Sequence, residues 1–237
     1  MKENFLAKLG NFHINKLLFE LSSKSYLNFS LYAFHFSLPE DTMLQKTVKR
    51  VFSRIPTLMT RRLTMRAMKP IDSYDMFEYA HRMDVTRYLT WQPHPSREYT
   101  RDYLEFIGKC YRNGEFYDWA LIWCADGEYR EKMIGTCGFT RFDYDNNAAE
   151  VGYVINPEYR GRGVAPEALA RVLEFGFSEL KLNRIEARYI VGNEVSRRVM
   201  EKVGMKFEGV RRQSLLNRGE YVDVGYCSIL ASEFFSK

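Results

Sequence analysis

The sequence lacks the features that would place a chain in or across a membrane. No apolar run reaches the roughly eighteen residues that a membrane helix needs, because Glu20, Lys24, Asn28 and His35 interrupt the most apolar region. Residues 1–16 are charged and are followed only by Leu-Leu-Phe before Glu20, so we expect no secretory signal. Repeats and low-complexity tracts are also missing, and 46% hydrophobic residues among 237 suffice for a full core.

Patterns that bind metals or form disulfides are missing as well. The four cysteines form no Cys-x-x-Cys pair and have no histidine at a metal-ligand spacing, so we predict no metal site. We expect all four to be reduced core residues of a cytoplasmic protein: Cys110, Cys124, Cys137 and Cys227. The net charge of +5 is modest. It suits attraction of a polyanionic cofactor, because nucleic-acid affinity usually needs a denser basic patch.

Residues 156–177 read NPEYRGRGVAPEALARVLEFGF, a turn that leads directly into a helix with one apolar face. The first amides of a helix have no internal partners and lie at the positive end of its dipole. Gly161 and Gly163 let the backbone approach a ligand closely, and Arg160 and Arg162 add positive charge. The turn therefore predicts a binding site for a phosphate or pyrophosphate.

Three phosphate-binding motifs were compared with this turn. A nucleoside triphosphate P-loop needs Gly-Lys-Ser/Thr, but Val164 follows Gly163. A dinucleotide fingerprint needs a third glycine where Pro166 stands. The pattern Gln/Arg-x-x-Gly-x-Gly/Ala is filled by Arg160, Gly163 and Ala165. A plain strand-to-helix turn is the alternative for this short pattern taken alone.

The flanking segments extend the pattern. Residues 148–155 predict a strand that ends at Asn156-Pro157, and an alternating segment from Ile185 to Val191 predicts another. A second helix is expected to begin after a capping Asn193 and to stop at Gly204.

The order of these elements resembles the core of the GCN5-related N-acetyltransferase (GNAT) superfamily: a strand, an anion-binding loop, a helix, a strand and a helix. Within this superfamily, the sequence most resembles the branch that acetylates the N-termini of bacterial ribosomal proteins. Three stretches carry this resemblance: RRLTMRAMKPIDSYDMFEY, YLTWQPHPSREYTRDYLEFI and RRQSLLNRGEYVDVGYCSIL. The resemblance covers about residues 56–237. It implies an α/β GNAT fold, with a mixed, mostly antiparallel central sheet, flanking helices and a splayed strand pair at the acetyl-CoA site.

The resemblance also implies that acetyl-CoA is the co-substrate and that no metal takes part. The loop residues are expected to hold the pyrophosphate: Arg160, Gly161, Arg162, Gly163, Val164 and Ala165. The end of the preceding strand, Val154 and Ile155, is expected to bind the pantetheine arm, because a strand that splays there leaves unpaired amides. Asn193 and Ser196 resemble the second coenzyme A segment of the family.

For the chemistry, the resemblance implies direct attack of an amine on the thioester. Glu150 is a candidate general base acting through water, with a charged residue on a sheet face as the alternative. Many superfamily members place an acidic tyrosine where this chain has Met200, and the ribosomal branch instead uses a serine, which Ser196 matches. The alternative for Ser196 is a helix cap. Trp91 and His94 lie in a stretch that resembles a substrate-side loop of the family.

The expected acceptor is a protein or peptide N-terminal α-amine. An α-amine has a pKa of about 8, against about 10.4 for lysine, and so needs less help from a base. Some relatives carry an acidic residue where this chain has Leu215, which removes one base candidate. The alternatives are a small amine such as an antibiotic, polyamine or amino acid, and an acyl-CoA binding module without turnover.

Residues 1–55 lie outside the resemblance and form a predicted N-terminal extension. Leu27, Phe29 and Leu31 indicate a strand, and an apolar stripe from Leu44 to Ile55 indicates a helix with a basic face. A basic amphipathic helix suits an anionic surface such as ribosomal RNA, and a linker helix packed on the core is the alternative. We expect a monomer or a homodimer.

Overall fold

The computed structural model describes residues 41–124 and 131–236. The strand expected at residues 27–31 lies outside the described residues. Residues 41–237 form one compact unit. Within it the helix expected in the extension is present as α3 (Met43–Phe52), and its Val48 and Phe52 are fully buried in the domain core.

One eight-stranded sheet forms the centre of the described part of the chain, in the order β1-β2-β3-β4-β5-β6-β8-β7. The strands are β1 (Leu58–Met59), β2 (Leu63–Arg66), β3 (Tyr117–Trp123), β4 (Lys132–Asp143), β5 (Ala148–Ile155), β6 (Arg184–Ile190), β7 (Lys206–Asn217) and β8 (Glu220–Leu230). Only β5 and β6 pair in parallel. The predicted fold class, a mixed and mostly antiparallel sheet, is confirmed.

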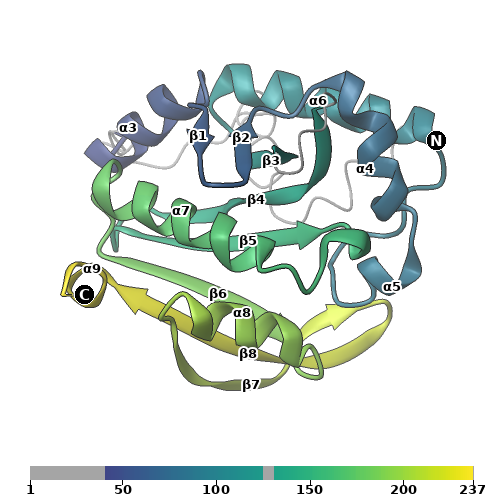
Figure 1. The fold of residues 1–237 in the computed structure, drawn as a ribbon. Coiled ribbons are helices and arrows are strands. Elements are labelled where there is room, and N and C mark those ends of the chain that lie inside the picture. Colours follow the sequence, from purple (N-terminus) through teal and green to yellow (C-terminus); the bar gives the residue numbers. More distant parts are fainter. Residues whose placement is uncertain (1–40, 125–130, 237) are drawn as a thin grey trace, which may run out of the picture. The chain divides into compact units, whose positions relative to one another are not determined.

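The parallel pair β5–β6 is also where the sheet opens. Its register runs from Ala148 opposite Arg184 to Val151 opposite Ala187, and then stops. Both strands continue, and they diverge toward their carboxyl ends (Figure 1). The splayed strand pair expected from the resemblance is therefore present.

Helices cover both faces of the sheet (Figure 1). One face packs on α7 (Val164–Ser178), α8 (Glu194–Lys202) and α3 around residues such as Val151, Leu169 and Phe52. The other packs on α4 (Ser73–Ala80) and α6 (Arg97–Asn113) around Ala120 and Met133. Two short helices complete the described fold, α5 (Met83–Thr86) and α9 (Ala231–Phe235).

The four elements expected around the loop, β5, α7, β6 and α8, are present within one or two residues of the predicted bounds. One expectation fails in part. All four cysteines are free, and Cys137 and Cys227 are buried, but Cys110 is only half-buried and Cys124 is exposed. Cys124 is the clearest exception. It follows the last residue of β3, where the apolar strand has already ended, so it is not a core residue.

Candidate active site

The predicted anion-binding loop connects β5 to α7. Gly161 and Gly163 have φ values of 76° and 77°, in the left-handed region that favours glycine. Gly163 is the N-cap of α7 and no side chain caps the helix. In the described part of the chain, the amides from Gly161 to Ala165 donate no backbone hydrogen bond outside the helices and strands. The loop thus offers the free amides and the helix dipole that an anion needs.

The two arginines of the loop point in different directions. Nε of Arg160 donates to the carbonyl oxygen of Ile155 at 3.3 Å, and burial lowers the pKa of Arg160. The Arg162 guanidinium lies 5.2 Å from the centroid of the Tyr159 ring. An arginine pKa starts so high that Arg160 stays positively charged near neutral pH despite this shift.

A half-buried ion pair that the sequence did not suggest supports this loop. Arg62, in the β1–β2 turn, donates through Nε to Oε2 of Glu167 at 2.7 Å and through Nη1 to the carbonyl oxygen of Arg162 at 2.8 Å. Thr60 Oγ1 and the Arg62 amide both donate to Oε1 of Glu167. Burial raises the pKa of Glu167, but these hydrogen bonds outweigh it and lower the pKa overall. Arg62 therefore holds both the loop and the first turn of α7.

The strand end that precedes the loop is paired on one side only. Residues 152–155 pair with β4, from Gly138 to Gly135, and no strand pairs with them on the β6 side. Val154 and Ile155 lie in this segment. A strand with an open side offers main-chain donors and acceptors to an extended ligand.

Ser196 faces the same opening from the first turn of α8. Its amide donates to Oδ1 of Asn193, the N-cap residue, at 3.3 Å. Its Oγ lies 2.8 Å from the hydroxyl of Tyr153 on β5, and that hydroxyl also donates to the Ser196 carbonyl oxygen at 2.9 Å. Burial raises the pKa of Tyr153, so the phenol stays protonated. Sequence analysis missed Tyr153, although its place next to Gly152 on an alternating strand was a usable signal.

Glu150 lies on β5 just before the opening and is buried. Its Oε1 is 2.9 Å from Nε of Arg188 and accepts from the Thr140 hydroxyl at 3.1 Å. Its Oε2 is 3.7 Å from Nη2 of Arg141. Both carboxylate oxygens thus have a cationic neighbour.

Trp91 and His94 lie together before α6, with ring centroids 5.4 Å apart. His94 is buried, and its Nδ1 lies 2.9 Å from Oγ1 of Thr100. Burial lowers the pKa of His94 to about 4, so the imidazole is neutral at pH 7. The structure gives His94 partners inside the protein, and a contact of either residue with substrate stays a prediction.

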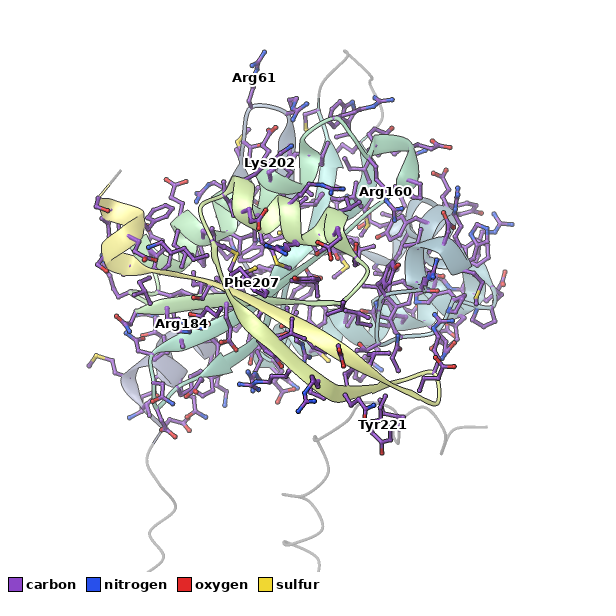
Figure 2. All side chains as sticks on the ribbon, turned by 90° about the horizontal axis from the view of Figure 1, so that it is seen from below. Arg61, Arg160, Arg184, Lys202, Phe207 and Tyr221 are labelled. Carbon is purple, nitrogen blue, oxygen red and sulfur yellow. The ribbon has the colours of Figure 1, made fainter. Side chains whose placement is uncertain are left out.

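The end of α5 and the residues just after it contact two loops, the β7–β8 turn and the loop between β6 and α8. Nη2 of Arg218, in the β7–β8 turn, donates to both oxygens of Thr86 at 2.9 Å. The Tyr88 hydroxyl donates to the carbonyl oxygen of Gly192 at 3.2 Å. Tyr221, beside the same turn, is exposed and points outward (Figure 2).

A strand pair that opens beside an uncapped, glycine-lined helix N-terminus is the arrangement of an acyl-CoA dependent transferase. The family model described as Acetyltransferase (GNAT) domain matches residues 62–206, so the chain belongs to the GNAT acetyltransferase family. It is 32% identical over 178 residues to an uncharacterised N-acetyltransferase, p20, of Bacillus licheniformis, covering 75% of this chain and 98% of the relative. An acetyltransferase structure from Bacillus anthracis has a TM-score of 0.65 and 29% identity, covering 75% of this chain and all of that one.

Two further relatives have names that mention an acceptor. One is a proposed ribosomal N-acetyltransferase, YdaF, of Bacillus subtilis, 36% identical over 106 residues, or 45% of this chain and 58% of the relative. The other is spermidine N(1)-acetyltransferase of Vibrio cholerae, 25% identical over 76% of this chain and 99% of the relative. The described residues contain no group of side chains that would hold a metal ion, and none of their helices has the length and apolarity to cross a membrane.

Proposed function

We propose that this acetyltransferase transfers acetyl from acetyl-CoA to the α-amine of a protein or peptide N-terminus. The observation that carries the proposal is the likeness to YdaF over 106 residues, 45% of this chain. The chemistry supports it, because an α-amine is more often neutral at pH 7 than a lysine side chain. Leu215 pairs with Val222 in the β7–β8 hairpin and offers no base to a lysine.

In this proposal the loop amides and arginines of residues 160–165 hold the pyrophosphate. The open side of Val154 and Ile155 binds the pantetheine arm, and Asn193 holds the first turn of α8 in place. The fit is supported by the free amides at the N-terminus of α7 and by the missing strand partner of residues 152–155.

In this proposal Ser196 protonates the leaving thiolate. The proposal is supported by the contact between its hydroxyl and the neutral Tyr153 phenol, at 2.8 Å, on the unpaired segment of β5. A hydroxyl pair of this kind relays a proton without carrying a charge itself. A general-base function of Glu150 stays a prediction. The carboxylate would have to accept a proton while it is paired with Arg188 and Arg141.

A ribosome contact is the part of the proposal that depends on α3. The basic side chains of α3 are exposed, and they line a recess of about 620 Å³ together with Arg112 of α6: Lys46, Lys49 and Arg50. Clustered cations attract the phosphates of RNA. A cytoplasmic location and a monomeric or dimeric state also remain predictions.

The test is coenzyme A release with a panel of acceptors at one acetyl-CoA concentration. The panel holds peptides with different N-terminal residues, the same peptides with a blocked α-amine and a free lysine, and spermidine, amino acids and aminoglycosides. We expect turnover with free α-amines and none with the blocked peptides. Turnover confined to small amines would overturn the protein-substrate proposal and would favour the activity of the spermidine acetyltransferase relative.

The non-catalytic alternative, an acyl-CoA binding module, gives a different result in the same experiment. Acetyl-CoA would bind in calorimetry, while no amine in the panel would release coenzyme A.

A further inference from the structure

Asp118 carries a second carboxylate on the same face of the sheet as Glu150, and the surroundings of the two carboxylates differ. Asp118 is the second residue of β3 and pairs with Gly138 of β4, which in turn pairs with Gly152 of β5. Directly opposite residues point to the same face. Gly152 is also the first residue beyond the last β5–β6 pair. This row of three residues therefore ends where β5 and β6 separate: Asp118, Gly138 and Gly152.

The two glycines leave this row without side chains between Asp118 and the opening. A Cβ placed on Gly138 would lie 2.9 Å from Oδ1 of Asp118, so the carboxyl group occupies the space above Gly138. A Cβ placed on Gly152 would meet only Thr140 Cγ2 within 4 Å. Asp118 itself keeps part of its surface accessible. The carboxyl group thus leans over Gly138 toward β5, and at Gly152 the Thr140 methyl group is the one side-chain neighbour that a Cβ would meet within 4 Å.

Two buried oxygens, on residues that interact electrostatically, have no hydrogen-bond partner. Oδ1 of Asp118 and the hydroxyl of Tyr79, on α4, are covered by protein and make no hydrogen bond in the described structure. A buried polar atom without a partner is costly and rare, unless a water or a ligand satisfies it. A carboxylate oxygen and a phenol can both accept hydrogen bonds from an ammonium group.

Among the described residues, no cation balances the Asp118 carboxylate. Burial raises the pKa of Asp118 to about 7, against hydrogen bonds from Thr136 and the Trp119 amide that lower it. No lysine or arginine contributes. The titratable groups that feel its charge are all neutral at pH 7: Tyr79 of α4, Tyr103 and Tyr111 of α6, and Cys137 of β4. Glu150, in contrast, lies between two arginines.

We propose that Asp118 is the catalytic residue that takes the proton from the acceptor ammonium, with the Tyr79 hydroxyl accepting a second N–H. The inference rests on acetyl transfer to an amine and not on which amine is used. A buried carboxylate oxygen without a hydrogen-bond partner, in a row that ends at the unpaired segment of β5, is suited to this step.

The ammonium gives one proton to Oδ1 of Asp118, and its nitrogen lone pair forms the C–N bond to the thioester carbonyl carbon. The C–S bond breaks, and the thiolate takes a proton from Ser196. The second N–H proton of the adduct replaces the one that Ser196 gave. Asp118 then releases its proton to solvent.

The test is the pH dependence of kcat, from about pH 5 to 9, with an amine that turns over in the panel. Asp118→Asn should lower kcat about 10²- to 10⁴-fold and remove the rise of kcat near pH 7. Thr136→Val removes a hydrogen bond to the charged form and should move that rise to higher pH while keeping it. Asp102→Asn, an exposed aspartate of α6, is the matched control and should leave the profile unchanged.

Folding is checked by thermal unfolding of the same variants. A raised aspartate pKa stabilises the folded state below the unfolded pKa of about 4, and this stability is lost as the pH rises to the folded pKa. Asp118→Asn should therefore have a higher Tm than the wild type above pH 7, and the difference should shrink toward pH 4. A variant that is more stable and less active has not failed by unfolding.

Two results would overturn the proposal. One is a pH profile of kcat in Asp118→Asn that equals that of the wild type, most plainly if Glu150→Gln loses the rise of kcat near pH 7 instead. The other needs no acceptor: carbon-13 labelled aspartate gives a carboxyl signal that is missing in Asp118→Asn, and a titration midpoint below about 5 excludes Asp118 as a base near neutral pH. If no amine in the panel turns over, the proposed function fails. The titration midpoint then still shows whether Asp118 can act as a base near neutral pH.

Discussion

The two ends of β5 differ in what lies on their β6 side. From Ala148 to Val151 the strand is paired with both neighbours, and the ion pairs of Glu150 join it to β4 and β6. From Gly152 to Ile155 it is paired with β4 alone and leads into the glycine loop. One strand of eight residues thus anchors the sheet at one end and offers a binding edge at the other.

The largest effect is expected where the open end meets α7. Gly163→Asp adds a negative charge and a side chain at a φ of 77°, with its Cβ 3.5 Å from Nη2 of Arg62, and should abolish acetyl-CoA binding. Gly219→Asp, at a φ of 88° in the β7–β8 turn, carries the same backbone strain away from the loop and serves as the control. Unchanged affinity of a folded Gly163→Asp variant in calorimetry would contradict the loop assignment.

A large effect on turnover is expected at the α8 side of the opening. Ser196→Ala should lower kcat by about tenfold to ten-thousandfold with little change in acetyl-CoA affinity, as for loss of a general acid. Tyr153→Phe removes only the bonded hydroxyl and should produce a smaller decrease in the same direction. Stopped-time assays of coenzyme A release measure both. Wild-type turnover in both variants would show that the α8 side of the opening contributes to catalysis by positioning the reactants and not by transferring a proton.

A moderate effect on the cofactor is expected from the support behind the loop. Arg62→Ala leaves Glu167 and the Arg162 carbonyl without their donor and should weaken acetyl-CoA binding about 10- to 100-fold, with kcat nearly unchanged at saturation. Arg61→Ala is the matched control, because Arg61 is exposed and points away from the protein (Figure 2). Equal affinities of the two variants would show that the loop keeps its shape without Arg62.

The smallest effect is expected at the paired end of β5. Glu150→Gln weakens the pairing with Arg188 and Arg141 and should lower Tm by about 2–4 °C, the equivalent of about 1 kcal/mol in a domain of this size. We expect the rise of kcat with pH to persist. Its loss would instead support the prediction, made from the sequence, that Glu150 is the base.

The sequence predicted the parts of the site that are local. The strand at 148–155, the loop and α7 follow each other within thirty-one residues, and each is signalled by its own alternation, glycines or helical period. Asn193 was found in the same way, as a helix cap, whereas Ser196 was found through the resemblance to the ribosomal branch of the family. These signals need no knowledge of the sheet.

The contacts that were missed depend on register and on long-range pairing. Asp118 comes near the opening only because β3, β4 and β5 align it with Gly138 and Gly152. An aspartate that opens the apolar strand YDWALIW was a signal, but its neighbours across the sheet could not be read from the sequence. Tyr153 meets Ser196 because α8 packs over the strand opening, forty-three residues further along the chain.

The bond between Arg62 and Glu167 joins residues 105 positions apart, and this separation has a consequence for how the protein forms. The β1–β2 turn is synthesised well before α7, so the loop gains its support only after a late, entropically costly closure. A partly folded chain that has made α7 alone would bind acetyl-CoA poorly. Acetyl-CoA added during refolding should therefore favour the completed domain over its intermediates, by binding the state in which the β1–β2 turn and α7 have met.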